Sequence, residues 1–124
     1  MSSVEAVWTI RFGWLADQQE DWEKGVLALF SNQMVGGDSV MAYIGNYTVD
    51  GNRISGQLTI VRHDLPENRK TYYKDQDLRF DVALEGTYST DEIVGRLVKK
   101  GRKDAKFTMK KLAPLPISSV SVLP

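Results

Sequence analysis

The 124-residue chain has no cysteine and a single histidine, His63. The absence of cysteine excludes disulfides, thiol nucleophiles, iron–sulfur clusters and cysteine-ligated zinc. A single histidine excludes metal sites that need several histidine ligands. The neighbouring acid, Asp64, would point to the opposite face of a strand and is poorly placed to orient the imidazole. We therefore expect a protein that is not an enzyme and that has no catalytic residues, metal site or cofactor.

The chain also lacks net charge and long apolar runs. It carries 16 basic and 16 acidic side chains, so it exerts no long-range attraction on nucleic acid or on an anionic membrane. No uncharged stretch approaches the ~18–20 apolar residues of a membrane span. The segment Met1–Phe12 has neither the basic nor the apolar region of a signal peptide. These absences predict one cytoplasmic globular domain that does not bind nucleic acid directly or associate with membranes.

Charge is distributed unevenly along the chain. Residues 1–50 carry seven acids and two bases, residues 51–95 eight acids and six bases, and residues 96–124 one acid and eight bases. The basic C-terminal part is consistent with a surface for an acidic partner. The simpler interpretation is a solvated hairpin turn at Lys99–Asp104 that keeps a sheet edge soluble. The acids between residues 17 and 23 lack the spacing of a calcium-binding loop and predict a solvated loop.

Apolar side chains recur at every second residue through most of the chain. In the clearest run, Leu78–Glu85, apolar residues alternate with Arg79, Asp81, Ala83 and Glu85. This period of two is typical of strands with one buried face. Eight strands are predicted, at residues 6–14, 23–31, 33–37, 40–49, 53–62, 77–86, 92–99 and 105–112. Because most of the connections are short, we expect consecutive strands to pair as an antiparallel meander.

Glycine inside several of these strands favours strong bending, and closure of a bent sheet removes exposed edges. We therefore predict an all-β fold, an eight-stranded up-and-down antiparallel barrel of lipocalin-like architecture, at residues 1–112. A flexible apolar tail is expected at 113–124, and an open sandwich is the alternative fold. An eight-stranded barrel is filled by side chains or holds one small ligand. The residues predicted to line a cavity for a small apolar ligand are Trp8, Ile10, Phe12, Leu58, Phe80, Val82 and Phe107.

Glycine also occurs in the predicted turns. Asp50-Gly51-Asn52 predicts a hairpin turn with one residue at positive φ. Asn32-Gln33 predicts another hairpin turn, and Gly36-Gly37-Asp38 a structural loop whose glycines need positive φ. A short echo connects Gly45–Asp50 with Gly86–Asp91. Each has the pattern Gly-x-Tyr-[Ser/Thr]-x-Asp followed by Ile-x-Gly-x-Leu, which predicts one type of hairpin used twice.

The order of motifs across residues 7–112 resembles the GrlR family, small negative regulators of type III secretion genes in enteric bacteria. The resemblance is carried by Gly25–Leu29, Asn32–Ser39, Tyr43–Tyr47 and Arg62-His63. It implies a lipocalin-like eight-stranded barrel, a homodimer and no catalysis. It also implies a function, because a member of the family holds a transcriptional activator inactive by binding it.

That member uses an acidic Glu-Asp-Glu-Asp turn. The matching positions here are Val49, Asp50, Gly51 and Asn52, of which only Asp50 is acidic. The resemblance therefore implies a non-enzymatic regulatory binding protein whose partner-binding residues are these four. The alternative is an intracellular carrier or sensor of a small apolar ligand held in the barrel.

Overall fold

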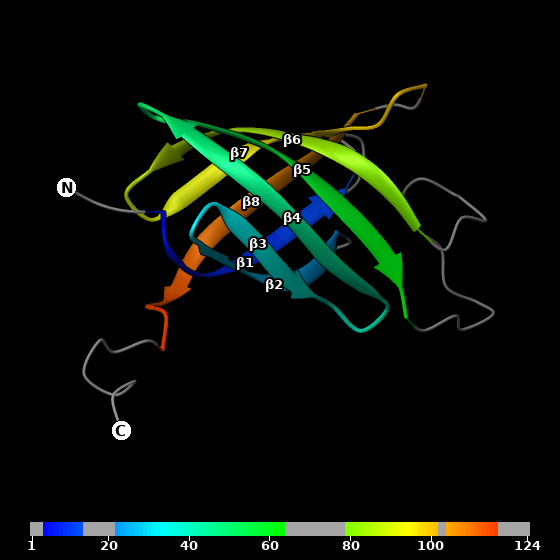
Figure 1. The fold of residues 1–124 in the computed structure, drawn as a ribbon, viewed down its shortest axis with the longest axis horizontal. Coiled ribbons are helices and arrows are strands. Elements are labelled where there is room, and N and C mark those ends of the chain that lie inside the picture. Colours follow the sequence, from blue (N-terminus) through cyan, green and yellow to red (C-terminus); the bar gives the residue numbers. More distant parts are fainter. Residues whose placement is uncertain (1–3, 14–21, 64–78, 102–103, 117–124) are drawn as a thin grey trace.

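The computed structural model describes residues 4–13, 22–63, 79–101 and 104–116. In this part of the chain the fold has no helix and consists of eight strands that form a closed antiparallel barrel (Figure 1). The strands are β1 (Ala6–Gly13), β2 (Glu23–Phe30), β3 (Gln33–Gly37), β4 (Met41–Asp50), β5 (Arg53–Arg62), β6 (Arg79–Ser89), β7 (Glu92–Val98) and β8 (Ala105–Ala113). The predicted up-and-down barrel is confirmed, and the open sandwich is excluded.

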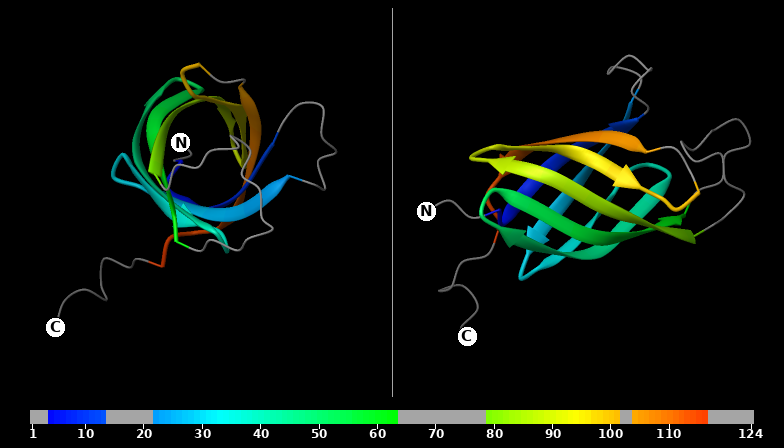
Figure 2. Two further views of the ribbon diagram at one scale, coloured as in Figure 1. Left: turned by 90° about the vertical axis from the view of Figure 1, so that its right-hand side faces the viewer. Right: turned by 90° about the horizontal axis from the view of Figure 1, so that it is seen from above.

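Pairing of the first strand with the last closes the barrel. The antiparallel β1–β8 ladder runs from Val7–Ala113 to Gly13–Lys106, with a bulge between Val7 and Trp8. Seen end-on, the strands form a continuous ring (Figure 2, left). Closure pairs both sides of every strand, which removes the edges along which sheets aggregate.

The hairpin turns predicted at Asn32-Gln33 and at Asp50-Gly51-Asn52 both contain residues at positive φ, and the first was predicted one residue away from its observed position. Gly51 lies in the β4–β5 turn with φ +62°, as predicted. The β2–β3 turn is formed by Ser31 and Asn32, both at positive φ, whereas Gln33 already belongs to β3. The predicted Asn32-Gln33 turn is therefore one residue too late. Asparagine tolerates this conformation, and Ser31 is held by the bond from its backbone N–H to the Glu5 carboxylate, at 2.7 Å.

Two predictions concern Gly36 and Gly37: the predicted strand 33–37 is confirmed, and the predicted loop at Gly36-Gly37-Asp38 is wrong for these two glycines. Both belong to β3, and neither has a positive φ. A Cβ at Gly36 would overlap the carbonyl oxygen of Val26 in β2, so the close approach of two strands requires glycine here. The same holds for all inward-facing glycines of the described strands, where an added Cβ would lie within 3 Å of a backbone oxygen of a neighbouring strand. The inward-facing glycines are Gly25, Gly36, Gly45, Gly56, Gly86 and Gly95. They allow the sheet to bend tightly.

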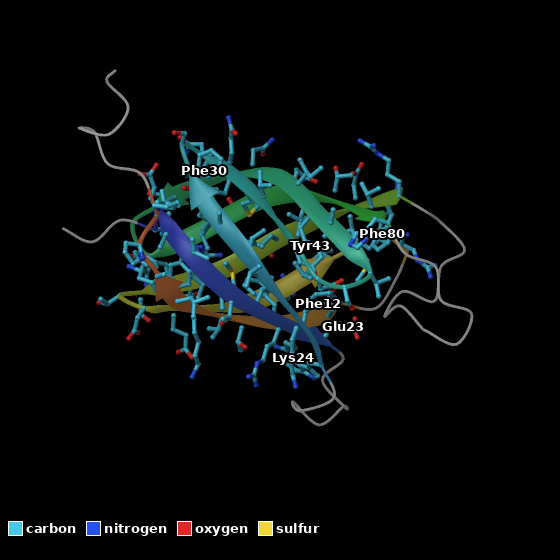
Figure 3. All side chains as sticks on the ribbon, turned by 90° about the horizontal axis from the view of Figure 1, so that it is seen from below. Phe12, Glu23, Lys24, Phe30, Tyr43 and Phe80 are labelled. Atoms are coloured by element: carbon cyan, nitrogen blue, oxygen red, sulfur yellow. The ribbon has the colours of Figure 1, made fainter. Side chains whose placement is uncertain are left out.

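Alternation along each strand separates an inner from an outer face. The inward side chains of all eight strands form one hydrophobic cluster, and Figure 3 shows Phe12 and Tyr43 within it. β8 includes Ala113, so the barrel extends one residue beyond its predicted end. Several predicted features fall on segments outside the described residues. These segments are residues 14–21, which include Trp14 and most of the expected acidic loop, residues 64–78 between β5 and β6, and the tail from residue 117.

Candidate functional site

The seven residues predicted to line a ligand cavity all lie in the hydrophobic cluster. Each is at most 7% exposed: Trp8, Ile10, Phe12, Leu58, Phe80, Val82 and Phe107. A cavity large enough for a ligand would leave accessible surface on the side chains that line it. These side chains have almost none, so they fill the space around them by packing on their neighbours. Two edge-to-face pairs, Trp8–Tyr88 and Phe12–Tyr43, have ring centroids 6.3 and 6.0 Å apart.

Lysine side chains cover this cluster at opposite ends of the barrel. The Lys111 Nζ lies 5.5 Å from the centroid of a Trp8 ring, and the Lys99 Nζ lies 4.8 Å from the Phe80 centroid. In each case the aliphatic stem shields apolar surface while the ammonium group meets the ring face.

Asp38 organises the turn between β3 and β4. Its Oδ1 accepts hydrogen bonds from the backbone N–H groups of Val40 and Met41, at 2.8 and 2.7 Å. Its own N–H donates to the Met41 carbonyl at 2.8 Å. The second carboxylate oxygen accepts a hydrogen bond from the Tyr43 hydroxyl. Hydrogen bonds to a charged acceptor are the stronger kind, so one side chain sets the shape of this turn.

The Tyr43 hydroxyl stays protonated in this environment. Tyr43 is buried, and burial raises its pKa far above the usual range. The hydrogen bond to Asp38 and the negative charges of Asp38 and Glu23 raise the pKa further. The hydroxyl therefore acts as a fixed hydrogen-bond donor at neutral pH.

His63 belongs to the same cluster. Its Nε2 lies 3.1 Å from the Asp38 carbonyl oxygen, and its backbone N–H donates to the Val40 carbonyl at 2.8 Å. The histidine thus fastens the segment after β5 to the β3–β4 turn. Sequence reasoning considered His63 and Asp38 separately and gave no role to Tyr43. An aspartate often accepts hydrogen bonds from the backbone N–H groups two and three residues later in a turn. The position of Asp38 between two predicted strands could therefore have indicated its role.

The four residues expected to bind a partner form an exposed hairpin tip. Val49 and Asp50 end β4, Gly51 and Asn52 make the turn, and all four are exposed, Val49 by 41%. The tip is held in place because the Asn52 carbonyl accepts a 2.6 Å hydrogen bond from the backbone N–H of Tyr88 in β6. The tip is therefore held on β6 by a backbone hydrogen bond, and its one charged side chain, Asp50, lies opposite Arg53 of β5.

The outer surface of β1–β5 has an uncharged apolar region that sequence reasoning did not predict. Two rows of outward residues cross these strands in register: Val7, Ala28, Val35, Ile44 and Thr59, and Thr9, Val26, Gly37, Ala42 and Val61. We call these ten residues the uncharged face. Val26 and Val35 are each 45% exposed and Ile44 is 52% exposed. This region could have been predicted from the sequence, because its outward-facing residues in β2–β4 are apolar. A contiguous exposed apolar region is typical of an interaction site.

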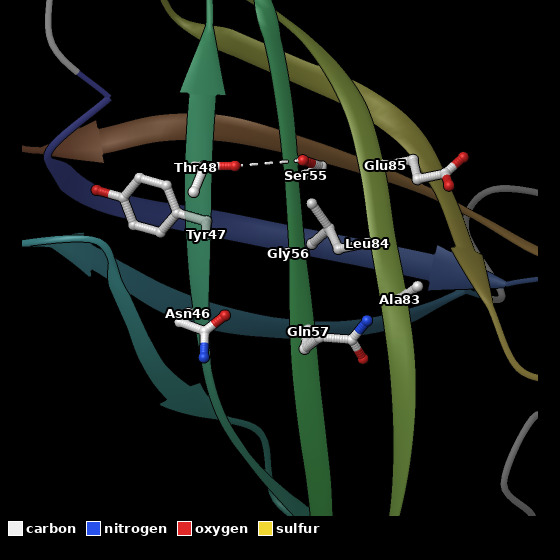
Figure 4. Close-up of a pocket in the computed structure, with 9 residues that line it drawn as sticks. All are labelled: Asn46, Tyr47, Thr48, Ser55, Gly56, Gln57, Ala83, Leu84 and Glu85. Carbon is white, nitrogen blue, oxygen red and sulfur yellow. Dashed lines mark hydrogen bonds between the residues drawn. The ribbon is translucent and has the colours of Figure 1, made fainter.

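A polar hollow borders the uncharged face. It has a volume of about 260 Å³ and lies over Gly56, where β5 bends (Figure 4). Glu85 lines it on β6, and the amides of Asn46 and Gln57 and the hydroxyls of Thr48 and Ser55 line it on β4 and β5. The two hydroxyl oxygens are 3.4 Å apart. The amides and hydroxyls are neutral hydrogen-bonding groups suited to the polar rim of an interface.

No protein-family model and no curated protein matches the chain. Among the described residues, no three acidic or histidine side chains are grouped so that they could hold a metal ion. Within the same residues, no helix has the length and apolar character needed to cross a membrane. The interpretation of the surface therefore depends on its own geometry.

Proposed function

We propose that the chain is a non-enzymatic regulatory binding protein that acts by protein–protein contact as a homodimer, as its resemblance to the GrlR family implies. The observation that supports this proposal is the uncharged face, a contiguous apolar surface outside a barrel whose core side chains pack on one another. By the same resemblance, the bound partner is a transcriptional activator. The regulated process is the expression of type III secretion genes.

The uncharged face suits a second copy of the chain. In a twofold interface the same patch contacts itself, so every charge on the patch would be buried twice, and a charge near the axis would meet its own copy. All ten residues of this face are neutral. Two rows across five strands cover roughly 350 Å² at ~4.8 Å per strand, about half of the ~800 Å² that each partner contributes to a standard interface. The adjoining neutral residues Gln33, Asn46 and Gln57 extend the contact as a polar rim.

The dimer is expected to dissociate when Ile44 is replaced by lysine. The twofold axis brings two uncompensated ammonium groups into the apolar interface, which weakens association roughly 100-fold or more. Sedimentation velocity at high micromolar concentration should give twice the 14.0 kDa chain mass for the wild type and the chain mass for Ile44→Lys. Ser89→Lys, at an exposed position at the end of β6, is the matched control and should remain dimeric. A monomeric wild type, or a dimeric Ile44→Lys, contradicts the assignment.

The regulatory role is tested in the source cells. Deleting the gene should raise transcription of the regulated genes, and the wild-type chain should restore repression. Asp50→Lys should fail to restore it, because it reverses the only acidic charge at the tip expected to bind the activator. RNA sequencing measures both effects.

The matched control is Asp91→Lys, the same change in the neighbouring β6–β7 turn. If Asp50→Lys and Asp91→Lys repress transcription equally, the hairpin tip does not bind the activator. Transcript levels that do not respond to the deletion would disprove the regulatory function. The alternative function, a carrier of a small apolar ligand, requires the packed core side chains to separate, and no specific observation in the described part of the chain favours it.

A further inference from the structure

A second surface region, which we call the basic strip, runs across the outer faces of β5–β8, β1 and β2. One row in register consists of Arg53, Thr87, Val94, Thr108, Arg11 and Lys24. Arg96, Lys106 and Lys110 flank this row on β7 and β8. All six cations are exposed, and the acids facing them in the register are Asp50, Glu85 and Glu92.

Like charges face one another directly in the basic strip. Arg11 is opposite Lys24, and Lys106 is opposite Arg96. Facing side chains have Cβ atoms about 4.5–5.5 Å apart, so these pairs repel each other and destabilise the sheet. Arg96 is compensated by Glu85 and Asp104, at 3.1 and 3.4 Å. Among the described residues, no ion pair compensates Arg11, Lys24 or Lys106. A surface with this repulsion is one that an anionic ligand would stabilise.

A hollow lies within the basic strip. It has a volume of about 200 Å³ over Gly86 and Gly95, where β6 and β7 bend. Three cations and one acid are among the side chains that line it: Arg53, Arg96, Lys106 and Glu85. It is large enough for a carboxylate group and carries excess positive charge. The exposed Val94 also lines the hollow and offers apolar contact.

We propose that the basic strip binds an extended acidic segment of a partner protein, in which carboxylates alternate with apolar side chains. The strip crosses five strand spacings, about 24 Å at ~4.8 Å each, which an extended segment of about seven residues spans. Nucleic acid fits less well, because the residues between the cations are Thr87, Val94 and Thr108 and offer no ring on which a base could stack. The proposed dimer contact uses other residues than this strip, whereas Arg53 of the strip lies opposite Asp50 of the hairpin tip.

Fluorescence anisotropy with a labelled peptide of alternating glutamate and valine, about ten residues long, tests the proposal. The wild type should bind the peptide at low salt and lose affinity as salt screens the charges. Lys106→Glu and Arg11→Glu should each weaken binding about tenfold or more. The matched control is Arg79→Glu, an identical charge change at an exposed residue of β6 outside the strip, which should leave the affinity within about twofold.

The proposal is overturned if Arg79→Glu weakens binding as much as Lys106→Glu, since net charge alone would then explain the affinity. It is also overturned if the wild type does not bind the peptide at low salt, or if a peptide with lysine in place of glutamate binds equally well. Tighter binding of a single-stranded oligonucleotide that Lys106→Glu abolishes would reassign the strip to nucleic acid. Circular dichroism checks the fold of each variant, and Ile44→Lys should retain peptide binding whatever its oligomeric state.

Discussion

Replacing Gly95 by alanine should lower the free energy of unfolding by about 3 kcal/mol or more. Gly95 faces Gly86 across β6 and β7 on the inside of the barrel. An added Cβ would overlap the carbonyl oxygen of Glu85 and lie 2.6 Å from the Gly86 Cα. Both obstacles are backbone atoms, so no side-chain rotation can relieve the overlap. The two strands would have to separate, at the expense of their ladder hydrogen bonds.

Urea and thermal unfolding of Gly95→Ala measure this effect, with an expected decrease in the melting temperature of roughly 10 °C. Gly51→Asn is the control, because Gly51 has φ +62° and nothing within 4 Å of an added Cβ. Asparagine tolerates this conformation, so the control should change stability by less than about 0.5 kcal/mol. A Gly95→Ala variant as stable as the control would show that the barrel bends without the need for glycine there.

Asp38→Ala should reduce stability by about 3–4 kcal/mol. The substitution removes the acceptor of three hydrogen bonds, from the backbone N–H groups of Val40 and Met41 and from the Tyr43 hydroxyl. Val40, Met41 and Tyr43 are all buried, so their donors lose a partner with little access to water. An unsatisfied buried donor costs more than the net contribution of the bond itself.

Denaturant unfolding separates the contributions to this cluster. Tyr43→Phe removes one donor and leaves the backbone bonds, so it should cost about 1 kcal/mol. Asp38→Asn keeps a neutral Oδ1 acceptor and should give an intermediate loss. If Asp38→Ala costs no more than Tyr43→Phe, the carboxylate does not stabilise the turn, and the β3–β4 connection is set by the strands alone.

Most of the strands could be predicted because the pattern that defines them is local. The alternation in Leu78–Glu85 correctly placed Phe80, Val82 and Leu84 inside. Side-chain direction in a strand depends only on the pleat of its own backbone, so period two is sufficient to separate the two faces. Asn32-Gln33 was one residue late because a polar pair shows that a turn occurs, but does not specify which residues have positive φ.

The glycines show where local reasoning fails. Gly36 and Gly37 belong both to a predicted strand, 33–37, and to a predicted loop, and they lie in β3 where another strand approaches closely. The echo between residues 45–58 and 86–97 gave two hairpins, as predicted, but their registers differ. Gly56 faces Tyr47, whereas Gly95 faces Gly86. The sequence already contains the cause, because Ile54 follows Asp50 by four residues whereas Ile93 follows Asp91 by two. The prediction of one type of hairpin used twice is therefore wrong in register.

The sequence predicted the eight strands and the buried face of those with clear alternation, and it favoured a closed barrel over an open sandwich from the glycines and the short connections. The surfaces required the three-dimensional fold. Arg11 and Thr108 are neighbours because β1 pairs with β8. This pairing joins Lys106 and Lys110 of the basic C-terminal part to Arg11 and Lys24 in the basic strip. The uncharged face and the Asp38–Tyr43–His63 cluster also combine residues from separate strands. Such neighbours are set by register and closure, which are properties of the whole sheet rather than of any segment of it.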